Sequence, residues 1–347
     1  MNNMRKFFAS VIAIALSISL VSCGGNTSSS SGASSDGTET ITWDFLDLDT
    51  ASHPMVVMLN EWSDQIYEES GGRLKINIRV GGELPFTTNE YLDAVSAGSV
   101  QMAGCMVTAI SSYLEAGGLP ACPYMTTDIE TFNTVMEVLD PYLETEMENY
   151  NVFNAMTLFY PTQDVYGTGS VPSSYTDLAG LKIRTSGAEQ GVFWQNVGLI
   201  PTSIDAAEVS SALSMNVIDS VTTATMAVEM NKWYESLDWV YMCNSMVIPT
   251  YVVVNNDAFT ALPEDVQEVF LSVTADFAAS FPERMQEASD ASLAAIEEAG
   301  VQVVWATDDD KNTLKEIAVP LWDEYAASTG EEATQALSEI KEALGVA

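Results

Sequence analysis

The two cations Lys182 and Arg184 are the residues whose type and spacing best suit binding chemistry. The chain of 347 residues has a formal net charge of −37. Between residues 81 and 231 these two are the only lysine or arginine residues, against eighteen carboxylates. They alternate with Leu181 and Ile183, which is typical of a strand with its cations on one side. A guanidinium can grip a carboxylate with two parallel N–H groups, whereas an ammonium cannot. Arg184 is therefore either a binder of an anionic ligand or half of a structural ion pair with a nearby aspartate.

Few other residues offer catalytic or metal chemistry. His53 is the only histidine, so histidine-based catalysis has at most one candidate base and zinc lacks its commonest ligand. Cys105, Cys122 and Cys243 show no CxxC spacing, and we interpret them as small buried hydrophobes, although one disulfide pair stays open. Nucleotide loops and a nucleophile elbow are absent from the sequence. Carboxylates are abundant, so a secreted carboxylate-dependent hydrolase stays an alternative, yet nothing marks a catalytic pair.

Composition limits the class of protein and its partners. An apolar content of 47% is ample for a packed core, and the length suggests one large or two medium domains. The strong acidity argues against nucleic acid as a partner, because phosphate binding needs clustered lysine and arginine. It also argues against electrostatic docking on anionic lipid.

The N-terminus is predicted to direct the protein out of the cytoplasm. Arg5 and Lys6 precede an apolar stretch, residues 7–21, which is short for a membrane span. The run that ends at Cys23 resembles a bacterial lipoprotein signal, which implies removal of residues 1–22 and lipidation of Cys23. An ordinary secretory peptide is the alternative. Residues 23–39 are rich in serine and glycine and should form a flexible tether. We expect a membrane-anchored lipoprotein in the periplasm or on the outer cell surface.

Strands and helices alternate along the remainder, which favours a mainly parallel α/β sheet. Pro282 should kink or restart the long helix that contains it. Asp205 and Glu208 have the spacing of a capping box, and residues 161–174 are expected to be a turn-rich crossover. Strands are expected at 40–46, 74–80, 100–103, 152–160, 181–184, 201–204, 217–223, 246–255 and 301–305, and helices at 54–70, 90–97, 128–148, 188–197, 205–215, 226–233 and 263–298 and after Asp308.

Several short motifs, in order, resemble the solute-binding subunits of TRAP transporters, the DctP-like family, over roughly residues 40 to 340. The most specific is Asp177-Leu-Ala-Gly-Leu-Lys-Ile-Arg184. Each piece is weak alone, but their order and spacing together are specific. The others are Glu69-Ser-Gly-Gly-Arg-Leu74, Gly81-Gly-Glu-Leu84, the stretch from Tyr91 to Met102, Leu119-Pro120, Gly198, Pro201, Glu208-Val209, Ala212-Leu213 and Val217-Ile-Asp219.

The resemblance implies a two-lobe, periplasmic-binding-protein-like α/β fold with crossing segments and a long kinked connecting helix. Lobe I would comprise residues 40–161 and 250–289, and lobe II residues 162–249 and 290–347. An organic acid would bind in the cleft, by hinge closure, and pass to the transporter's membrane subunits. No enzymatic activity, cofactor or metal is implied. A receptor of the same fold that serves a sensor is a second reading, and a purely structural lipoprotein is a third.

In this family the carboxylate-binding arginine falls on Arg184. Many members have a second arginine near residues 163–165, where this chain has none and where Asp164 would repel an anion. Thr223 occupies a position that is often asparagine. We therefore expect a ligand with one carboxylate and an apolar or hydroxylated body. Aromatic residues could line the cleft, although core packing is at least as strong a reading for each. The candidate ligand-binding residues are Arg184, Thr223, Asp47, Phe45, Met106, Tyr251, Trp194 and Asp164.

Overall fold

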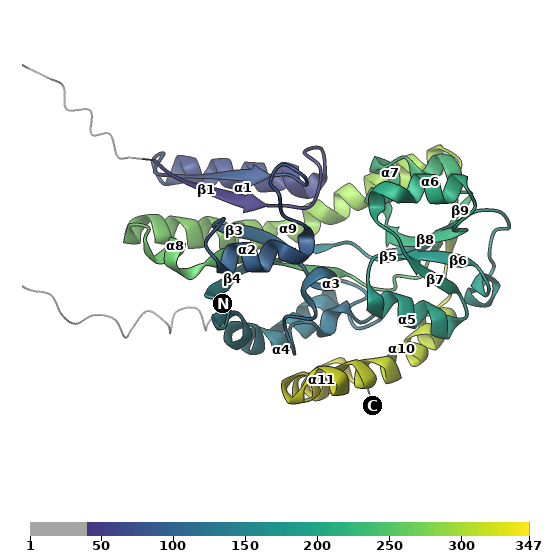
Figure 1. Cartoon of the computed structure of the whole chain (residues 1–347). Helices are drawn as coiled ribbons and strands as arrows, with labels where there is room; N and C mark the ends of the chain where they lie inside the picture. Colours follow the sequence, from purple (N-terminus) through teal and green to yellow (C-terminus); the bar gives the residue numbers. More distant parts are fainter. Residues whose placement is uncertain (1–39, 347) are drawn as a thin grey trace, which may run out of the picture. The chain divides into compact units, whose positions relative to one another are not determined.

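The computed structural model describes residues 40–346, which form two β-sheets with helices packed around them (Figure 1). The predicted signal segment, the lipidation site Cys23 and the tether lie outside the described residues. Within residues 40–346, no helix combines the length and the apolarity needed to cross a membrane.

The first sheet has the strand order β2-β1-β3-β10-β4. Its first three strands are parallel, and β10 runs antiparallel to both β3 and β4. The helix α1 begins at Pro54, which occupies the first helical turn without losing a hydrogen bond. The elements of this sheet and its helices are β1 (Ile41–Leu46), α1 (Pro54–Glu69), β2 (Leu74–Arg79), α2 (Tyr91–Ser96), β3 (Met102–Met106), α3 (Val107–Ile110), α4 (Ile129–Glu148), β4 (Val152–Tyr160), β10 (Ile248–Asn255) and α8 (Asn256–Thr260).

The second sheet has the strand order β11-β9-β5-β8-β6-β7. Strand β6 is parallel to β7 and β8, while β5 is antiparallel to β8 and β9. Helix α5 ends at Gly198, whose left-handed backbone suits a glycine. The elements of this sheet and its helices are β5 (Gln163–Gly167), β6 (Lys182–Thr185), α5 (Ala188–Val197), β7 (Ile200–Ser203), α6 (Val209–Ser214), β8 (Ser220–Ala224), α7 (Thr225–Met230), β9 (Trp239–Met242) and β11 (Gln302–Trp305).

Two long helical segments connect the sheets. Helix α9 (Glu264–Glu298) packs against α1 and β4 beside the first sheet and against α7 beside the second. Helix α10 (Asp308–Thr329) begins beside the second sheet, where the Tyr241 hydroxyl donates to Asp310 Oδ2 at 2.6 Å. Farther along α10, Trp322 Nε1 donates to the Pro123 carbonyl oxygen at 2.8 Å. The last helix, α11 (Glu331–Leu344), then packs against α4.

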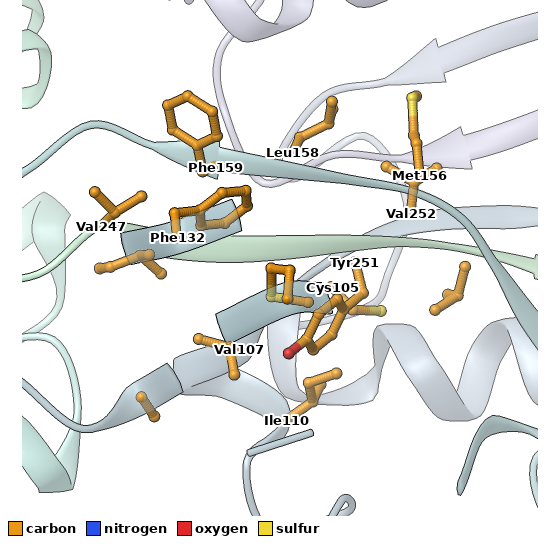
Figure 2. Close-up of a cluster of buried hydrophobic side chains, with 14 of the residues drawn as sticks. Cys105, Val107, Ile110, Phe132, Met156, Leu158, Phe159, Val247, Tyr251 and Val252 are labelled. Atoms are coloured by element: carbon orange, nitrogen blue, oxygen red, sulfur yellow. The ribbon is translucent and has the colours of Figure 1, made fainter. Parts of the chain in front are cut away.

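The core of the first sheet lies on both of its faces. Figure 2 shows Met156 and Val252 on one side of the central strands, with Tyr251 and Cys105 on the other. On the first of these sides, Trp43 and Phe45 make edge-on contacts with aromatic residues of α1 and α9. All three described cysteines are free and buried, as the sequence predicted.

The predicted two-lobe class and its long connecting helix are confirmed, but three local predictions were wrong. The sheets are mixed rather than mainly parallel, because the strands that pass between them run against their neighbours. Strand β5 lies in the segment expected to be turns, and β9 was missed. Helix α9 continues through Pro282 without a restart, and the alternative of a kink at Pro282 stays a prediction. Asp205 makes no side-chain capping bond. The predicted lobe boundaries stay a prediction.

Candidate ligand-binding site

Two strand connections show which edges of the sheets face each other. Strand β4 ends at Tyr160 and β5 begins at Gln163, while β9 ends at Met242 and β10 begins at Ile248. The last residues of β1 and β3 lie at the same edge as Tyr160, because β3 runs antiparallel to β10. By the same argument, the ends of β6 and β8 lie at the edge that carries Gln163. These strand ends therefore lie at the facing edges of the two sheets (Figure 1).

The two halves approach each other closely beside this edge. A Cβ atom added to Gly187, at the start of α5, would lie 3.5 Å from the Cβ atom of Thr108 in α3. The crossing segment is fixed by backbone hydrogen bonds, with Gln163 N donating to Met246 O and Ser245 N to Gln163 O, each at 2.8 Å. The two sheets are thus joined by short connections with backbone hydrogen bonds between them, as expected of a hinge.

Arg184 lies in β6 at the edge that faces the first sheet, and only 7% of it is exposed. Its Nε atom donates to the backbone oxygen of Ile204 at 2.8 Å. No carboxylate in residues 40–346 forms an ion pair with it. Burial lowers the pKa of Arg184, partly offset by the more distant charge of Asp205. The group nevertheless stays charged, since an arginine in a protein is not deprotonated. Arg184 thus carries a buried positive charge with four N–H donors unused.

Thr223 and Asp164 are register partners on β8 and β5 at the same edge, and both are buried. Asp164 Oδ1 accepts a hydrogen bond from Asn244 N at 2.7 Å. Asn244 has a left-handed backbone, with φ of 52°, so the carboxylate stabilises an uncommon turn in the crossing segment. Burial raises the pKa of Asp164 to about 7. The hydrogen bond from Asn244 and the charge of Lys311 lower this pKa, but by less than burial raises it. These contacts assign Asp164 to bracing the crossing segment.

Asp47 follows the last residue of β1 and is 3% exposed. Its Oδ1 atom accepts from Asp49 N at 2.8 Å, and its carbonyl oxygen accepts from the Tyr91 hydroxyl at 3.2 Å. Burial, followed by the charge of Asp49, raises the pKa of Asp47 to about 7. The structure therefore fixes this carboxylate firmly while leaving Oδ2 without a hydrogen-bond partner in the described chain.

The neighbours of Asp47 form a buried titratable cluster that sequence reasoning missed. The Tyr160 hydroxyl donates to Asp49 Oδ2 at 2.6 Å, and burial raises the pKa of Asp49 to about 6. His53 Nδ1 lies 3.3 Å from Asp49 Oδ2 and accepts from Met55 N at the start of α1. Burial lowers the pKa of His53 to about 4, so the ring is neutral at pH 7. The sequence did contain one signal for this cluster, because Asp47, Asp49 and His53 lie within seven residues of each other.

The apolar candidates lie mostly in the core. Phe45 and Trp194 are fully buried, with Phe45 in edge-on contact with Trp62 and Trp194 against Phe193. Tyr251 is also fully buried, and its hydroxyl donates to Gly117 O at 2.7 Å. Their predicted role as ligand walls stays a prediction, since each side chain is already enclosed by protein atoms. Met106, half-buried at the end of β3, is the apolar candidate that borders the edge.

Several threonines that the sequence analysis did not select have buried hydroxyl groups without a hydrogen-bond partner in the described residues. Such unsatisfied polar atoms are rare in folded proteins, and an ordered water molecule or a ligand can supply the hydrogen bond. They are Thr108 in α3, Thr222 in β8 and Thr250 in β10. A threonine in a sequence gives no signal of this kind. No group of three or more potential metal-ligating side chains occurs in the described residues, so nothing there indicates a metal site.

Comparison with known proteins decides the family. Residues 47–329 match the DctP model, described as bacterial extracellular solute-binding protein, family 7. The chain belongs to this family. As a family 7 solute-binding protein it is a binding protein rather than an enzyme, which removes support from the hydrolase alternative. The sequence-based assignment to the DctP-like group is confirmed.

Individual relatives of this family 7 protein are distant. The ectoine/5-hydroxyectoine-binding periplasmic protein UehA of Ruegeria pomeroyi is 26% identical over 186 residues, and the match spans 52% of this chain and 55% of UehA. Among solved structures, the pyroglutamic acid-binding receptor DctP6 of Bordetella pertussis has a TM-score of 0.80 at 21% identity, covering 87% of this chain and 100% of that one. A TRAP solute-binding protein of Roseobacter denitrificans with bound β-D-glucuronate has a TM-score of 0.77 at 19% identity, covering 87% and 99%. At these identities the solved structures establish the shared fold.

Proposed function

We propose that the protein is an extracytoplasmic TRAP receptor that binds an organic acid through one carboxylate and passes it to the membrane subunits of the transporter. The observation that carries the proposal is the buried guanidinium of Arg184, which forms no ion pair with any carboxylate of residues 40–346. A buried charge without a counterion is unfavourable, and a ligand carboxylate would remove that cost. The ligands of the similar proteins, pyroglutamic acid, glucuronate and ectoine, each contain a carboxylate.

Binding follows from the geometry of the two edges. Because Nε of Arg184 is held by Ile204 O, the guanidinium plane is fixed before a ligand arrives. Its remaining donors then match a carboxylate bidentately. Thr223, on the adjacent strand, contributes a hydroxyl at the same edge, and Met106 contributes apolar surface from the opposite sheet. Closure of the two lobes about the crossing segments would exclude water and strengthen the ion pair.

The missing second arginine limits the class of acid. Asp164 occupies the region where a second cation would be expected, and its carboxylate braces Asn244 instead. A dicarboxylate would therefore bring its second carboxylate toward Asp164, where the neighbouring cation Lys311 already donates a hydrogen bond to Asn244 Oδ1 at 3.0 Å. We propose a monocarboxylate as ligand.

The proposal includes the location of the protein. Residues 1–22 would be a signal peptide, and lipidation of Cys23 would anchor the mature protein in the cell envelope.

A thermal-shift panel with the mature soluble chain tests this function. The probes are pyroglutamate, glucuronate, galactonate, ectoine, succinate and malate, each followed by calorimetry where the melting temperature rises. We expect at least one monocarboxylate to stabilise the protein, and succinate and malate to have smaller effects. Stabilisation by none of the acids would overturn the receptor assignment, and a clear preference for the two dicarboxylates would overturn the monocarboxylate assignment alone.

A further inference from the structure

We infer that the ligand carries a cationic nitrogen in addition to its carboxylate, and that Asp47 is the residue that binds this nitrogen. The inference rests on the proposed function and narrows its ligand class from organic acids to zwitterionic acids. The carboxylate would pair with Arg184 at the edge of the second sheet. The cationic nitrogen would pair with Asp47 at the facing edge of the first.

The position of Asp47 is that of a preorganised acceptor. Its backbone nitrogen donates to Arg79 O at 2.9 Å, its carbonyl oxygen accepts from Tyr91, and its Oδ1 accepts from Asp49 N. These three hydrogen bonds fix the backbone and one carboxylate oxygen. Oδ2 is left over, on a residue that is almost fully buried. A preorganised acceptor loses little conformational freedom when a ligand binds.

The charge around Asp47 is negative and unbalanced. Neither lysine nor arginine pairs with it among residues 40–346. The nearest titratable groups are Asp49, a second carboxylate, and His53, which is neutral at pH 7. Tyr91 and Tyr160, which also face the cluster, are neutral hydroxyl donors. A cation placed beside Oδ2 would therefore meet two carboxylates and no competing positive charge.

A second observation marks the same place. Thr250 is 3% exposed, and its Oγ1 atom is buried without a hydrogen-bond partner. A Cβ atom added to Gly104 would lie 3.4 Å from Thr250 Cγ2 and 3.6 Å from Asp47 Oδ2. Thr250 and Asp47 thus flank the one backbone position of β3 that lacks a side chain. A ligand N–H group beside Gly104 would lie next to Asp47 Oδ2, with the Cγ2 methyl group of Thr250 and the ring of Phe45 as its other neighbours.

The two facing edges then have opposite unpaired charges, with Arg184 on one and Asp47 on the other. A neutral-bodied acid would pair only Arg184 and would leave Asp47 desolvated without a counterion. A zwitterion pairs both charges in one binding event. Amino acids and amidinium acids have this pattern, whereas a sugar acid or a lactam acid has one charge only.

Two matched probe pairs test the inference by calorimetry at pH 8. Proline is compared with tetrahydrofuran-2-carboxylate, in which an uncharged oxygen replaces the charged nitrogen. Ectoine is compared with pyroglutamate, a smaller ring whose lactam nitrogen carries no charge. Wild-type protein is compared with Asp47→Asn, which keeps the shape and the Oδ1 acceptor. Asp44→Asn is the control variant, since Asp44 lies in β1, three residues before Asp47, and its carboxylate pairs with Arg79.

We expect at least one zwitterion to bind wild-type protein tenfold or more tightly than its partner, and Asp47→Asn to reduce that ratio to within twofold of unity. Asp44→Asn should retain the wild-type ratio. Equal or tighter binding of the uncharged partners would overturn the inference while leaving the receptor function intact. Binding of the zwitterions that survives in Asp47→Asn at full ratio would also overturn it. If neither member of either pair nor any acid of the wider panel binds, the proposed function itself is wrong.

Discussion

The Nε atom of Arg184 is hydrogen-bonded to the carbonyl oxygen of Ile204 at 2.8 Å, and this contact sets the direction of the guanidinium. It uses one of the five N–H donors and leaves the two terminal amino groups side by side. Those two groups form the part of the guanidinium that matches the oxygens of a carboxylate. A backbone acceptor, which has no charge, thus orients the cation without neutralising it.

The substitution Arg184→Lys is expected to weaken binding of the best carboxylate by about 2–4 kcal/mol. Lysine keeps the charge but loses the bidentate geometry and the bond to Ile204. Calorimetry measures the change, with Arg284→Lys as the control because Arg284 pairs with Glu61 at the surface. Affinity within twofold of wild type would mean that Arg184 is not the carboxylate-binding group.

The stability of the ligand-free protein should depend on Asp47 between about pH 4 and pH 7. The pKa of Asp47 is raised on folding from 3.8 to about 7, so the folded state holds more protons than the unfolded state in this window. Stability contributed by this group is therefore present at low pH and is lost as pH rises, by up to about 1.4 kcal/mol per pH unit. The pKa of His53 is lowered, which gives the opposite slope between about pH 4 and 6.5.

Denaturant unfolding of wild type and Asp47→Asn across this range isolates the aspartate. The free-energy difference between the two proteins should shift steadily in favour of Asp47→Asn as pH rises. A difference that stays constant with pH would show that Asp47 titrates normally.

The substitution Gly104→Ala is expected to reduce ligand affinity tenfold or more with little loss of stability. The added methyl group would have ordinary van der Waals distances to Thr250, Asp47 and Phe45, so the fold can accept it. It would nevertheless occupy the space beside Asp47 Oδ2. The control is Gly191→Ala in α5, where the added atom has room and alanine favours the helix. Unchanged affinity in Gly104→Ala would place the ligand elsewhere.

The substitution Asp164→Ala is expected to lower the free energy of unfolding by about 1–3 kcal/mol, because it leaves the partly buried N–H group of Asn244 without its acceptor. Asp164→Asn keeps an acceptor oxygen and should retain most of the stability. Urea unfolding compares the two variants. Equal stabilities would show that the bond to Asn244 contributes nothing.

The sequence predicted those parts of the fold that depend on local pattern. Strict alternation from Leu74 to Val80 marks β2, and Pro54 with the glycines at 71 and 72 bounds α1. Strand β5 was missed because Gln163 and Asp164 are polar and lie between Pro161 and Gly167. They are buried all the same, since the crossing segment supplies their hydrogen-bond partners.

The sequence also predicted one part of the candidate site and missed another. Arg184 stood out as a rare cation on a predicted strand, and its burial without a counterion supports that choice. Spacing brings Asp49 and His53 together, but their contact with Tyr160 joins residues more than a hundred positions apart, which composition and spacing do not reveal. The unsatisfied hydroxyl of Thr250 likewise becomes visible only when every neighbour is in place.

Helix α10 places a limit on how far the two halves can separate. It is tied to the second sheet through Asp310 and to the first through Trp322, and the α11 segment that follows lies on α4. A helix is nearly inextensible, so the gap between its two attachment points cannot widen while both bonds hold. The C-terminal segment therefore tethers the two halves to each other in addition to the crossing strands. The two halves can open widely to release the solute only if one of these two hydrogen bonds breaks.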